Sequence, residues 1–385
     1  MKDISIYFKP TINNFSKESE TLGEKIIAHT ENYFPELDNK GIAFIYCPEY
    51  RNAGETNPSL LVYDELMSHL YKLHLGEDWN FAVYDLGIIV PGNTISDTYY
   101  ALAQVVAELV KNKIIPIVIG GTQDLTYAMY QGYQKLEQMV NLTNIDLKFD
   151  LGTPEEDIKD DAYISRILMD RPCYLFNCSN IGIQTPYVRK SEMELFEKLY
   201  FDVCRLGEFN ADFKKAEPLL RNTDLLGIDL NSIKGADFVS ENNTPNGFYA
   251  DQICQIAKYA GISDKLTALG IFNLPTQHLI GTNQQLIAEI CWYFIDGYAQ
   301  RKGDFPIGTK KDYTKFIVHL ESTENEIIFY KSPKSNRWWM EVPYPNKEGV
   351  KYERHHMVPC NLEDYEAAMK NEMPDLWWKT FQKLS

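Results

Sequence analysis

The sequence predicts an α/β fold, with helices in two layers around a parallel sheet of about eight strands. Short apolar runs rich in β-branched residues recur through the first 300 residues, and such runs are typical of buried strands. Segments with helical periodicity separate most of these runs, as the βαβ units of a parallel sheet require. A hydrophobic content of 44% over 385 residues is enough for a large core.

The predicted elements alternate along the chain. Residues 1–40 are expected to hold an edge strand, Ile4–Phe8, and then an amphipathic helix. The buried strands are predicted at Gly41–Cys47, Phe81–Gly87, Ile114–Ile119, Val140–Asp146, Tyr174–Ile183, Phe201–Leu206, Leu225–Leu230 and Ala268–Phe272. The helices are predicted at Leu60–Leu75, Ser96–Asn112, Tyr127–Gln138, Ser191–Lys198, Tyr249–Ala260 and Asn283–Tyr298. The strand Ile114–Ile119 is predicted to be the central one. Gly120 and Gly121 follow it and allow a sharp turn at its carboxyl end.

The pattern changes after residue 300, so we predict an α/β domain over residues 1–300 and an α+β extension over residues 301–385 packed on it. The expected elements of the extension are strands at Phe316–Leu320, Glu326–Tyr330 and Trp338–Val342 and short helices at Leu362–Lys370 and Asp375–Lys383. Four of the six tryptophans lie here, at 338, 339, 377 and 378. They either attach the extension to the main sheet or form an aromatic binding or oligomer surface. Attachment is favoured, because so small a segment buries little on its own.

Charge and cysteine content exclude some classes of partner. The formal net charge of -16 argues against nucleic acids and anionic membranes, since no basic field offsets it. The seven cysteines include no CxxC motif, which favours a reducing compartment over a disulfide framework. No apolar run reaches the length of a membrane span, and Met1–Pro10 lacks the apolar core of a signal peptide. We therefore expect a cytoplasmic protein.

Polar residues follow three of the predicted strands. The carboxyl ends of parallel strands line the crevice where open α/β sheets bind ligands. The residues expected at this rim are Gln123 and Asp124, then Asp146, Lys148 and Asp150, then Asp229 and Asn231. Alternate residues on an extended backbone share one face, and carboxylates so spaced suit hard divalent cations. Two such ions would activate a bridging water as a nucleophile.

Three motifs in this order resemble those of the ureohydrolase superfamily, which includes arginase, agmatinase and formimidoylglutamase. Gly120-Gly-Thr-Gln-Asp124 is similar to Gly-Gly-Asp-His-Ser, and Asp146-Leu-Lys-Phe-Asp150 is similar to Asp-Ala-His-x-Asp. Gly227-Ile-Asp-Leu-Asn-Ser-Ile-Lys-Gly235 is similar to Ser-x-Asp-x-Asp-x-x-Asp-Pro. The resemblance covers roughly residues 40 to 300 and includes Arg51-Asn-Ala-Gly54, which is similar to a formimidoylglutamase loop. It implies an arginase-like fold and hydrolysis of linear amidine or guanidino compounds with manganese held by two His and four Asp.

The departures from these motifs fall on the implied metal ligands. Gln123 and Lys148 stand where the family has its two His, Asn231 replaces one Asp, and Lys234 replaces the last carboxylate of the third motif. The carboxylates that match are Asp146, Asp150 and Asp229, and Asp124 replaces a Ser as a stray candidate ligand. A protonated ammonium has no lone pair, so Lys148 would not bind a metal and would instead contact two carboxylates at once. We expect a salt-bridge cluster in place of manganese. The alternative is a single metal held by Asp150, Asp229 and Gln123, with Lys148 swung aside.

Three hypotheses about function follow. The first is a non-catalytic relative of the ureohydrolases, without cofactor, that binds or assembles with a protein partner. The second is an active hydrolase of a linear amidine or guanidino compound with a rearranged manganese site, and it depends on the three retained Asp residues and the Arg51 loop. The third is a sensor that binds a small amidine or guanidino ligand in the same crevice. The resemblance also implies a homo-oligomer, since family members are often trimers or hexamers.

Overall fold

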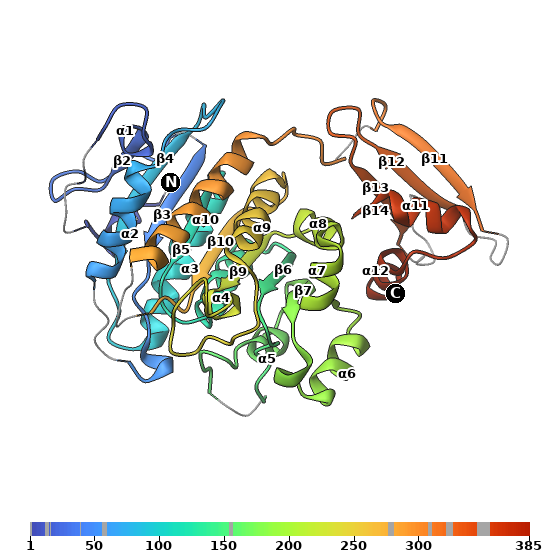
Figure 1. The fold of residues 1–385 in the computed structure, drawn as a ribbon, viewed down its shortest axis with the longest axis horizontal. Coiled ribbons are helices and arrows are strands. Elements are labelled where there is room, and N and C mark those ends of the chain that lie inside the picture. The colour runs from blue at the N-terminus through green and yellow to red at the C-terminus, as the bar shows by residue number, and fades with distance from the viewer. Residues whose placement is uncertain are drawn as a thin grey trace.

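Two β-sheets organise the protein (Figure 1). The computed structural model describes residues 2–11, 15, 17–38, 40–55, 60–153, 157–275, 281–306, 310–320, 326–344 and 355–385. Within these residues, ten strands form the first sheet and four form the second.

The large sheet has the order β1-β4-β3-β5-β10-β9-β6-β7-β8, and β2 also pairs with β4. Its strands are β1 (Phe8–Lys9), β2 (Ile26–Ala28), β3 (Gly41–Tyr46), β4 (Ala82–Ile89), β5 (Ile114–Ile119), β6 (Val140–Ile145), β7 (Leu175–Ile183), β8 (Asp202–Arg205), β9 (Leu225–Asp229) and β10 (Ala268–Phe272). Among the strand pairings described within this large sheet, only that of β1 with β4 is antiparallel. The predicted parallel sheet of about eight strands is therefore confirmed, with two short strands added at one edge.

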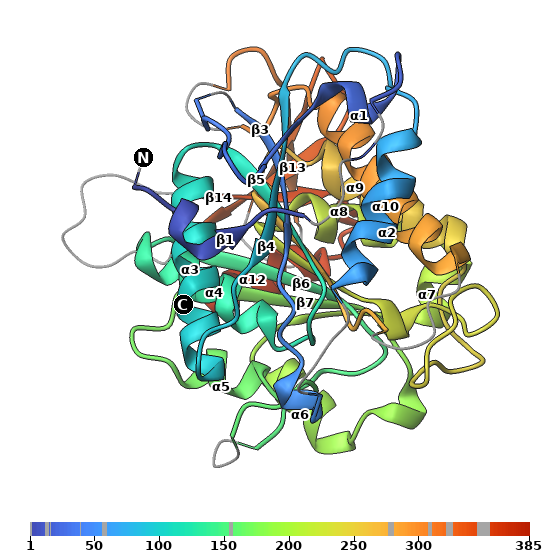
Figure 2. The same cartoon turned by 90° about the vertical axis from the view of Figure 1, so that its left-hand side faces the viewer.

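Helices cover both faces of this sheet, as the view along it shows (Figure 2). On one face lie α2 (Leu61–Lys72), α7 (Leu206–Ala211), α8 (Ala216–Arg221), α9 (Ala250–Ile262) and α10 (Gly281–Ala299). On the other lie α3 (Ile95–Lys111), α4 (Leu125–Lys135), α5 (Ile164–Met169) and α6 (Lys190–Lys198). The three-layer prediction is confirmed, and the double cover explains why β3 and β5 are apolar and buried throughout. None of the described helices combines the length and apolar character of a membrane span.

The amino-terminal prediction is wrong in part. The described residues of the first 40 contain a single turn of 3-10 helix, Ser5–Tyr7, the four-residue helix α1 (Leu22–Lys25) and the strands β1 and β2. No long amphipathic helix forms among them. Residues Ile26–Ala28 instead pair in parallel with β4, and the β-branched side chains of Ile26 and Ile27 favour a strand there.

The carboxyl-terminal sheet is antiparallel, in the order β11-β12-β13-β14. Its elements are β11 (Thr314–His319), β12 (Glu326–Lys331), β13 (Trp338–Pro343), β14 (His355–Cys360) and the helices α11 (Leu362–Met369) and α12 (Asp375–Leu384). Three of these strands were predicted, and β14 was not. The two helices pack on one face of the sheet, where Trp338 and Trp377 are buried with Phe329.

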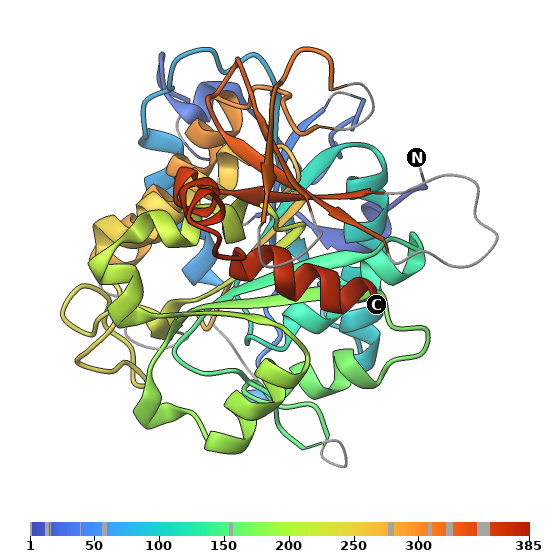
Figure 3. The ribbon, with the colours of Figure 1, turned by 90° about the vertical axis from the view of Figure 1, so that its right-hand side faces the viewer.

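Side chains from the large sheet and its helices hold this extension in place. The buried Arg221 of α8 donates to the backbone oxygens of Trp338, at 3.0 Å, and Cys360, at 2.8 Å. Its guanidinium also lies 4.8 Å from the ring centre of Trp339. Lys383 of α12 lies 3.8 Å from a carboxylate oxygen of Asp202 in β8, so the extension covers the β8 edge of the large sheet (Figure 3). A domain boundary near residue 300 stays a prediction.

Candidate functional site

The ends of four neighbouring strands meet at one rim of the large sheet. The order β5-β10-β9-β6 places the segments after β5, β9 and β6 close together, with β10 between β5 and β9. The three motifs of the sequence therefore converge. The strand between them adds Asn273, which was not among the residues expected at this rim.

Asp146 and Asp229 make the same local turn. Asp146 Oδ1 accepts a hydrogen bond from the backbone N of Lys148 at 3.1 Å, and Asp229 Oδ1 accepts one from the backbone N of Asn231 at 2.8 Å. A carboxylate that takes the amide two residues ahead bends the chain. The expectation that these alternating residues share the face of an extended strand is therefore wrong, since β6 ends at Ile145 and β9 at Asp229.

Asp150 is held in the same cluster by its backbone conformation and by hydrogen bonds to its carbonyl oxygen. Its backbone is left-handed, with φ of 48°, and its carbonyl oxygen accepts from the backbone N of Tyr163 and Ile164, both at 3.0 Å. These contacts tie the turn after β6 to the start of α5. The segment between them, which carries Asp160 and Asp161, thereby returns to the rim.

Lys148 contacts two carboxylates at once, as predicted. One of them, Asp150, belongs to the motifs, whereas the other, Asp161, was not among the predicted residues. Its ammonium Nζ lies 3.4 Å from Asp150 Oδ1 and 3.3 Å from Asp161 Oδ2. Burial lowers the pKa of Lys148, but the carboxylates of Asp150 and Asp146 raise it more, so the net shift is upward. The amine therefore keeps its proton and offers no lone pair.

The three buried carboxylates of the motifs hold protons unusually well. Burial raises the pKa of Asp150 to about 7 and that of Asp229 to about 6. Burial, followed by the charges of Asp150 and Asp229, raises the pKa of Asp146 well above its ordinary value.

Amide side chains occupy the centre of the rim. Asn273 Nδ2 donates to Asp229 Oδ1 at 2.8 Å, and Asn273 Oδ1 accepts from the backbone N of Gln123 at 3.2 Å. Asn273 thus joins β5, β10 and β9 from a left-handed backbone, with φ of 61°. Gln123 is fully buried, and its Oε1 has no hydrogen-bond donor. Asn231 Oδ1 accepts from Ser240 Oγ at 2.8 Å.

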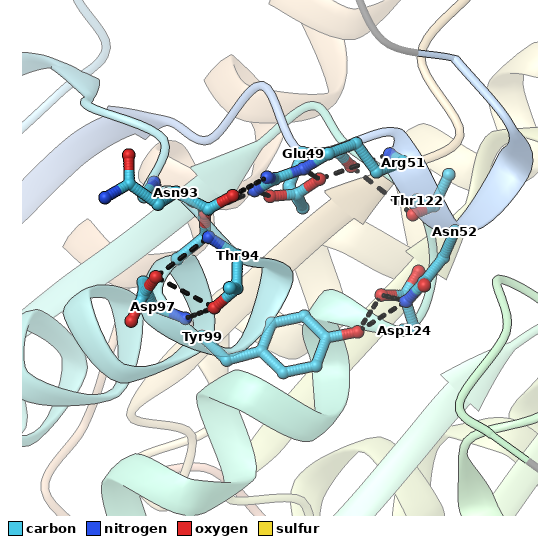
Figure 4. A network of polar contacts seen from close by, with 11 residues as sticks. Glu49, Arg51, Asn52, Asn93, Thr94, Asp97, Tyr99, Thr122 and Asp124 are labelled. Carbon is cyan, nitrogen blue, oxygen red and sulfur yellow. Dashed lines mark hydrogen bonds and ion pairs between the residues drawn. The ribbon is translucent and has the colours of Figure 1, made fainter.

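Asp124 faces a separate polar network (Figure 4). Its Oδ2 accepts from Asn52 Nδ2 at 2.8 Å and from the hydroxyl of Tyr99. In the same network Arg51 donates from Nε to Glu49 Oε1 at 2.8 Å and from Nη1 to the backbone oxygen of Asn93 at 3.0 Å. Its guanidinium therefore holds the loop after β3.

The rim opens into a crevice made of two adjoining hollows. The inner hollow has a volume of about 340 Å³ and the outer one about 400 Å³. They share Asp160, Asn231, Asn242 and Asn273. Of the predicted crevice residues, Lys148 and Asn231 line the inner hollow with the three motif carboxylates.

The other predicted crevice residues lie elsewhere. Gln123 and Asp124 are buried behind the rim and are not among the lining residues of either hollow. Lys234 lies against Tyr249, with its Nζ 3.2 Å from the phenol oxygen. Asp160 and Asp161, which do line the inner hollow, follow no strand and carry no motif, so sequence reasoning missed them.

Comparison with known proteins shows which family the chain is similar to. The model of the arginase family matches residues 47–223, a region that includes the first two motifs and ends before the third. The resemblance to the ureohydrolases is confirmed. No curated protein is matched by sequence.

Solved ureohydrolase structures share the fold. The formimidoylglutamase of Bacillus subtilis is 14% identical, with a TM-score of 0.64 over 77% of this chain and 98% of that one. A Trypanosoma cruzi formiminoglutamase structure with Mn²⁺ is 16% identical, with a TM-score of 0.60 over 68% of this chain and 95% of that one. The agmatine ureohydrolase of Thermoplasma volcanium is 16% identical, with a TM-score of 0.59 over 75% and 96%. Because these sequence identities are low, the comparison shows that the arginase-like fold is shared and nothing beyond the fold.

Proposed function

We propose that this chain is a non-catalytic ureohydrolase-fold protein that binds a ligand or partner without hydrolysing it. The observation that carries the proposal is the Lys148 ammonium, 3.4 Å from Asp150 Oδ1. In the motif that Lys148 interrupts, the family has a metal-ligating His. A protonated amine there supplies positive charge inside the carboxylate cluster and removes a ligand at the same time.

The remaining donors also fit a dinuclear manganese site poorly. Asp229 Oδ1 already accepts hydrogen bonds from Asn273 and from the backbone of Asn231. The amide oxygen of Asn231 accepts a hydrogen bond from the hydroxyl of Ser240. Within the described ranges, no group of three or more His, Cys, Asp or Glu side chains is arranged to hold a metal ion. Manganese in these enzymes supplies an activated water, and this donor set offers that chemistry weak support.

Metal uptake tests the proposal directly. The protein is incubated with manganese chloride and desalted, and its metal content and thermal midpoint are measured. We expect near-zero manganese and an unchanged midpoint, because a bound ion would stabilise the folded state by linkage. The matched variant Gln123→His/Lys148→His/Asn231→Asp, which restores the family's ligands, should take up the metal. One or more equivalents in the natural protein would overturn the proposal.

A second candidate is an active amidine hydrolase with a single metal. Two buried oxygens, Gln123 Oε1 and Asp146 Oδ2, have no hydrogen-bond donor and are free to act as ligands. Formimidoylglutamate, agmatine and arginine, each assayed with and without manganese, test this candidate. Metal-dependent release of formamide or urea, lost in Asp229→Ala, would establish it.

A further inference from the structure

Acidic side chains far outnumber basic ones in the lining of the crevice. Among the described residues that line its two hollows, seven side chains are carboxylates and one, Lys148, is an ammonium. Lys148 already contacts Asp150 and Asp161. The outer hollow adds Glu55 and Glu241, which belong to none of the three sequence motifs.

An unsatisfied buried atom lies at the inner end. Asp146 lines the inner hollow and is 1% exposed, yet its Oδ2 has no hydrogen-bond donor. A buried acceptor without a donor is costly in a folded protein. A ligand that brings an N–H group into the inner hollow would satisfy this oxygen.

The outer hollow combines carboxylates with an apolar wall. Val239, Leu274 and Pro275 line it beside Asp160 and Glu241. A metal ion gains nothing from such a wall, whereas a methylene chain removes it from water. No described Lys, Arg or His lines the outer hollow, so a ligand carboxylate there would meet only like charges.

We propose that the crevice binds an aliphatic diamine or polyamine. One ammonium group occupies the inner hollow near Asp146, the methylene chain follows the apolar wall, and a second ammonium lies near Asp160 and Glu241. This inference rests on the proposed function, because manganese would compete for the same inner carboxylates.

Calorimetric titration with spermidine and putrescine at constant ionic strength tests the inference. The matched control ligand is 4-aminobutanoate, which has the same number of carbon atoms as putrescine and carries a carboxylate in place of one aminomethyl group. We expect saturable binding of both amines and none of 4-aminobutanoate. Asp160→Asn and Glu241→Gln should each weaken spermidine binding by about 5-fold to 10-fold, because each removes one charge from the outer end. Glu366→Gln, an exposed change on α11, should leave the affinity within about 2-fold.

The outcomes separate this inference from the function on which it rests. Absent or non-saturable binding of both amines, or equal binding of 4-aminobutanoate, would overturn the diamine site. Equal effects of Glu241→Gln and Glu366→Gln would show a diffuse charge effect and would also overturn it. Manganese uptake, measured on the same preparation, bears on the non-catalytic proposal alone. Circular dichroism spectra of the variants establish that each is folded.

Discussion

Replacing Lys148 with methionine should destabilise the protein, and more so at high pH. The substitution keeps most of the apolar stem and removes the ammonium group. The carboxylate 3.4 Å away, Asp150, is buried and its Oδ1 has no hydrogen-bond donor. Loss of the ammonium therefore leaves a buried charge without compensation.

The expected size follows from the distances. At 3.4 Å and an effective dielectric constant of about 20, the attraction between Lys148 and Asp150 is about 5 kcal/mol. The Lys148 side chain is 39% exposed, so water screens part of this attraction, and the variant avoids the cost of burying the ammonium. Asp161 is 54% exposed and adds little. A net loss of about 2 kcal/mol remains for ionised Asp150.

The pH dependence follows from the pKa of Asp150. Burial raises that pKa to about 7 in the folded protein, above the ordinary value of 3.8. The folded state therefore holds a proton that the unfolded chain releases, and this contribution to stability is full below about pH 4 and lost as pH rises through 7. At pH 5.5 most Asp150 is protonated with or without Lys148, so the variant should lose little there. At pH 8 the full loss should appear.

Urea unfolding at pH 5.5 and pH 8 measures this difference. Lys148→Arg keeps the charge and should recover most of the stability. Lys258→Met is a matched control, because Lys258 is 36% exposed and lies 3.0 Å from Asp296 Oδ2, which also accepts from Gln300. Its loss should stay below about 1 kcal/mol at both pH values. The reasoning about Lys148 fails if Lys148→Met is as stable as the natural protein at pH 8, or loses no more than Lys258→Met.

Three further predictions concern the rim and the carboxyl-terminal sheet. Asn273→Ala removes a donor from buried Asp229 and should lower stability by about 1–3 kcal/mol in thermal unfolding, whereas an unchanged midpoint would make that contact dispensable. Burial lowers the pKa of His356 from 6.5 to about 4. Between these pH values the unfolded chain is protonated at this residue and the folded state is not, so acidification favours unfolding. Acidification from pH 7 to 5 should therefore cost the natural protein about 2 kcal/mol through this group, and His356→Gln should remove that dependence from the urea midpoint. Arg221→Lys cannot keep both hydrogen bonds to the carbonyl oxygens of Trp338 and Cys360, so amide hydrogen exchange in β13 and β14 should become faster. Equal exchange rates in the variant and the natural protein would show that the guanidinium does not stabilise these strands.

Much of the fold was predictable because its information is local. Apolar runs and helical periodicity identified the parallel strands β3 to β10 and the longer helices, and Ile114–Ile119 was placed without error. Elements that depend on distant partners were missed. The strand β14 holds His355, His356 and Pro359, which make a weak apolar pattern, and it is a strand because it pairs with β13. The short helices α5, α7 and α8 have too few turns for periodicity to be recognised.

The sequence by itself indicated part of the rim, namely three carboxylates and the lysine beside them. Local composition identifies the strand that Asp229 ends and the strand that Asp146 and Asp150 follow. In parallel strands all carboxyl ends point to one edge. It also showed that Gln123 and Lys148 stand at the positions where the family's motifs have histidine.

Only the tertiary structure decided which groups meet there. Asp161 pairs with Lys148 because the turn at Asp150 and its contacts with the start of α5 bring the intervening loop back to the rim. Asn273 reaches Asp229 because β10 lies between β5 and β9 in the sheet. This spatial order differs from the order of the strands along the chain. Strand order and loop return depend on packing between segments far apart in the chain, and local patterns carry no record of that packing.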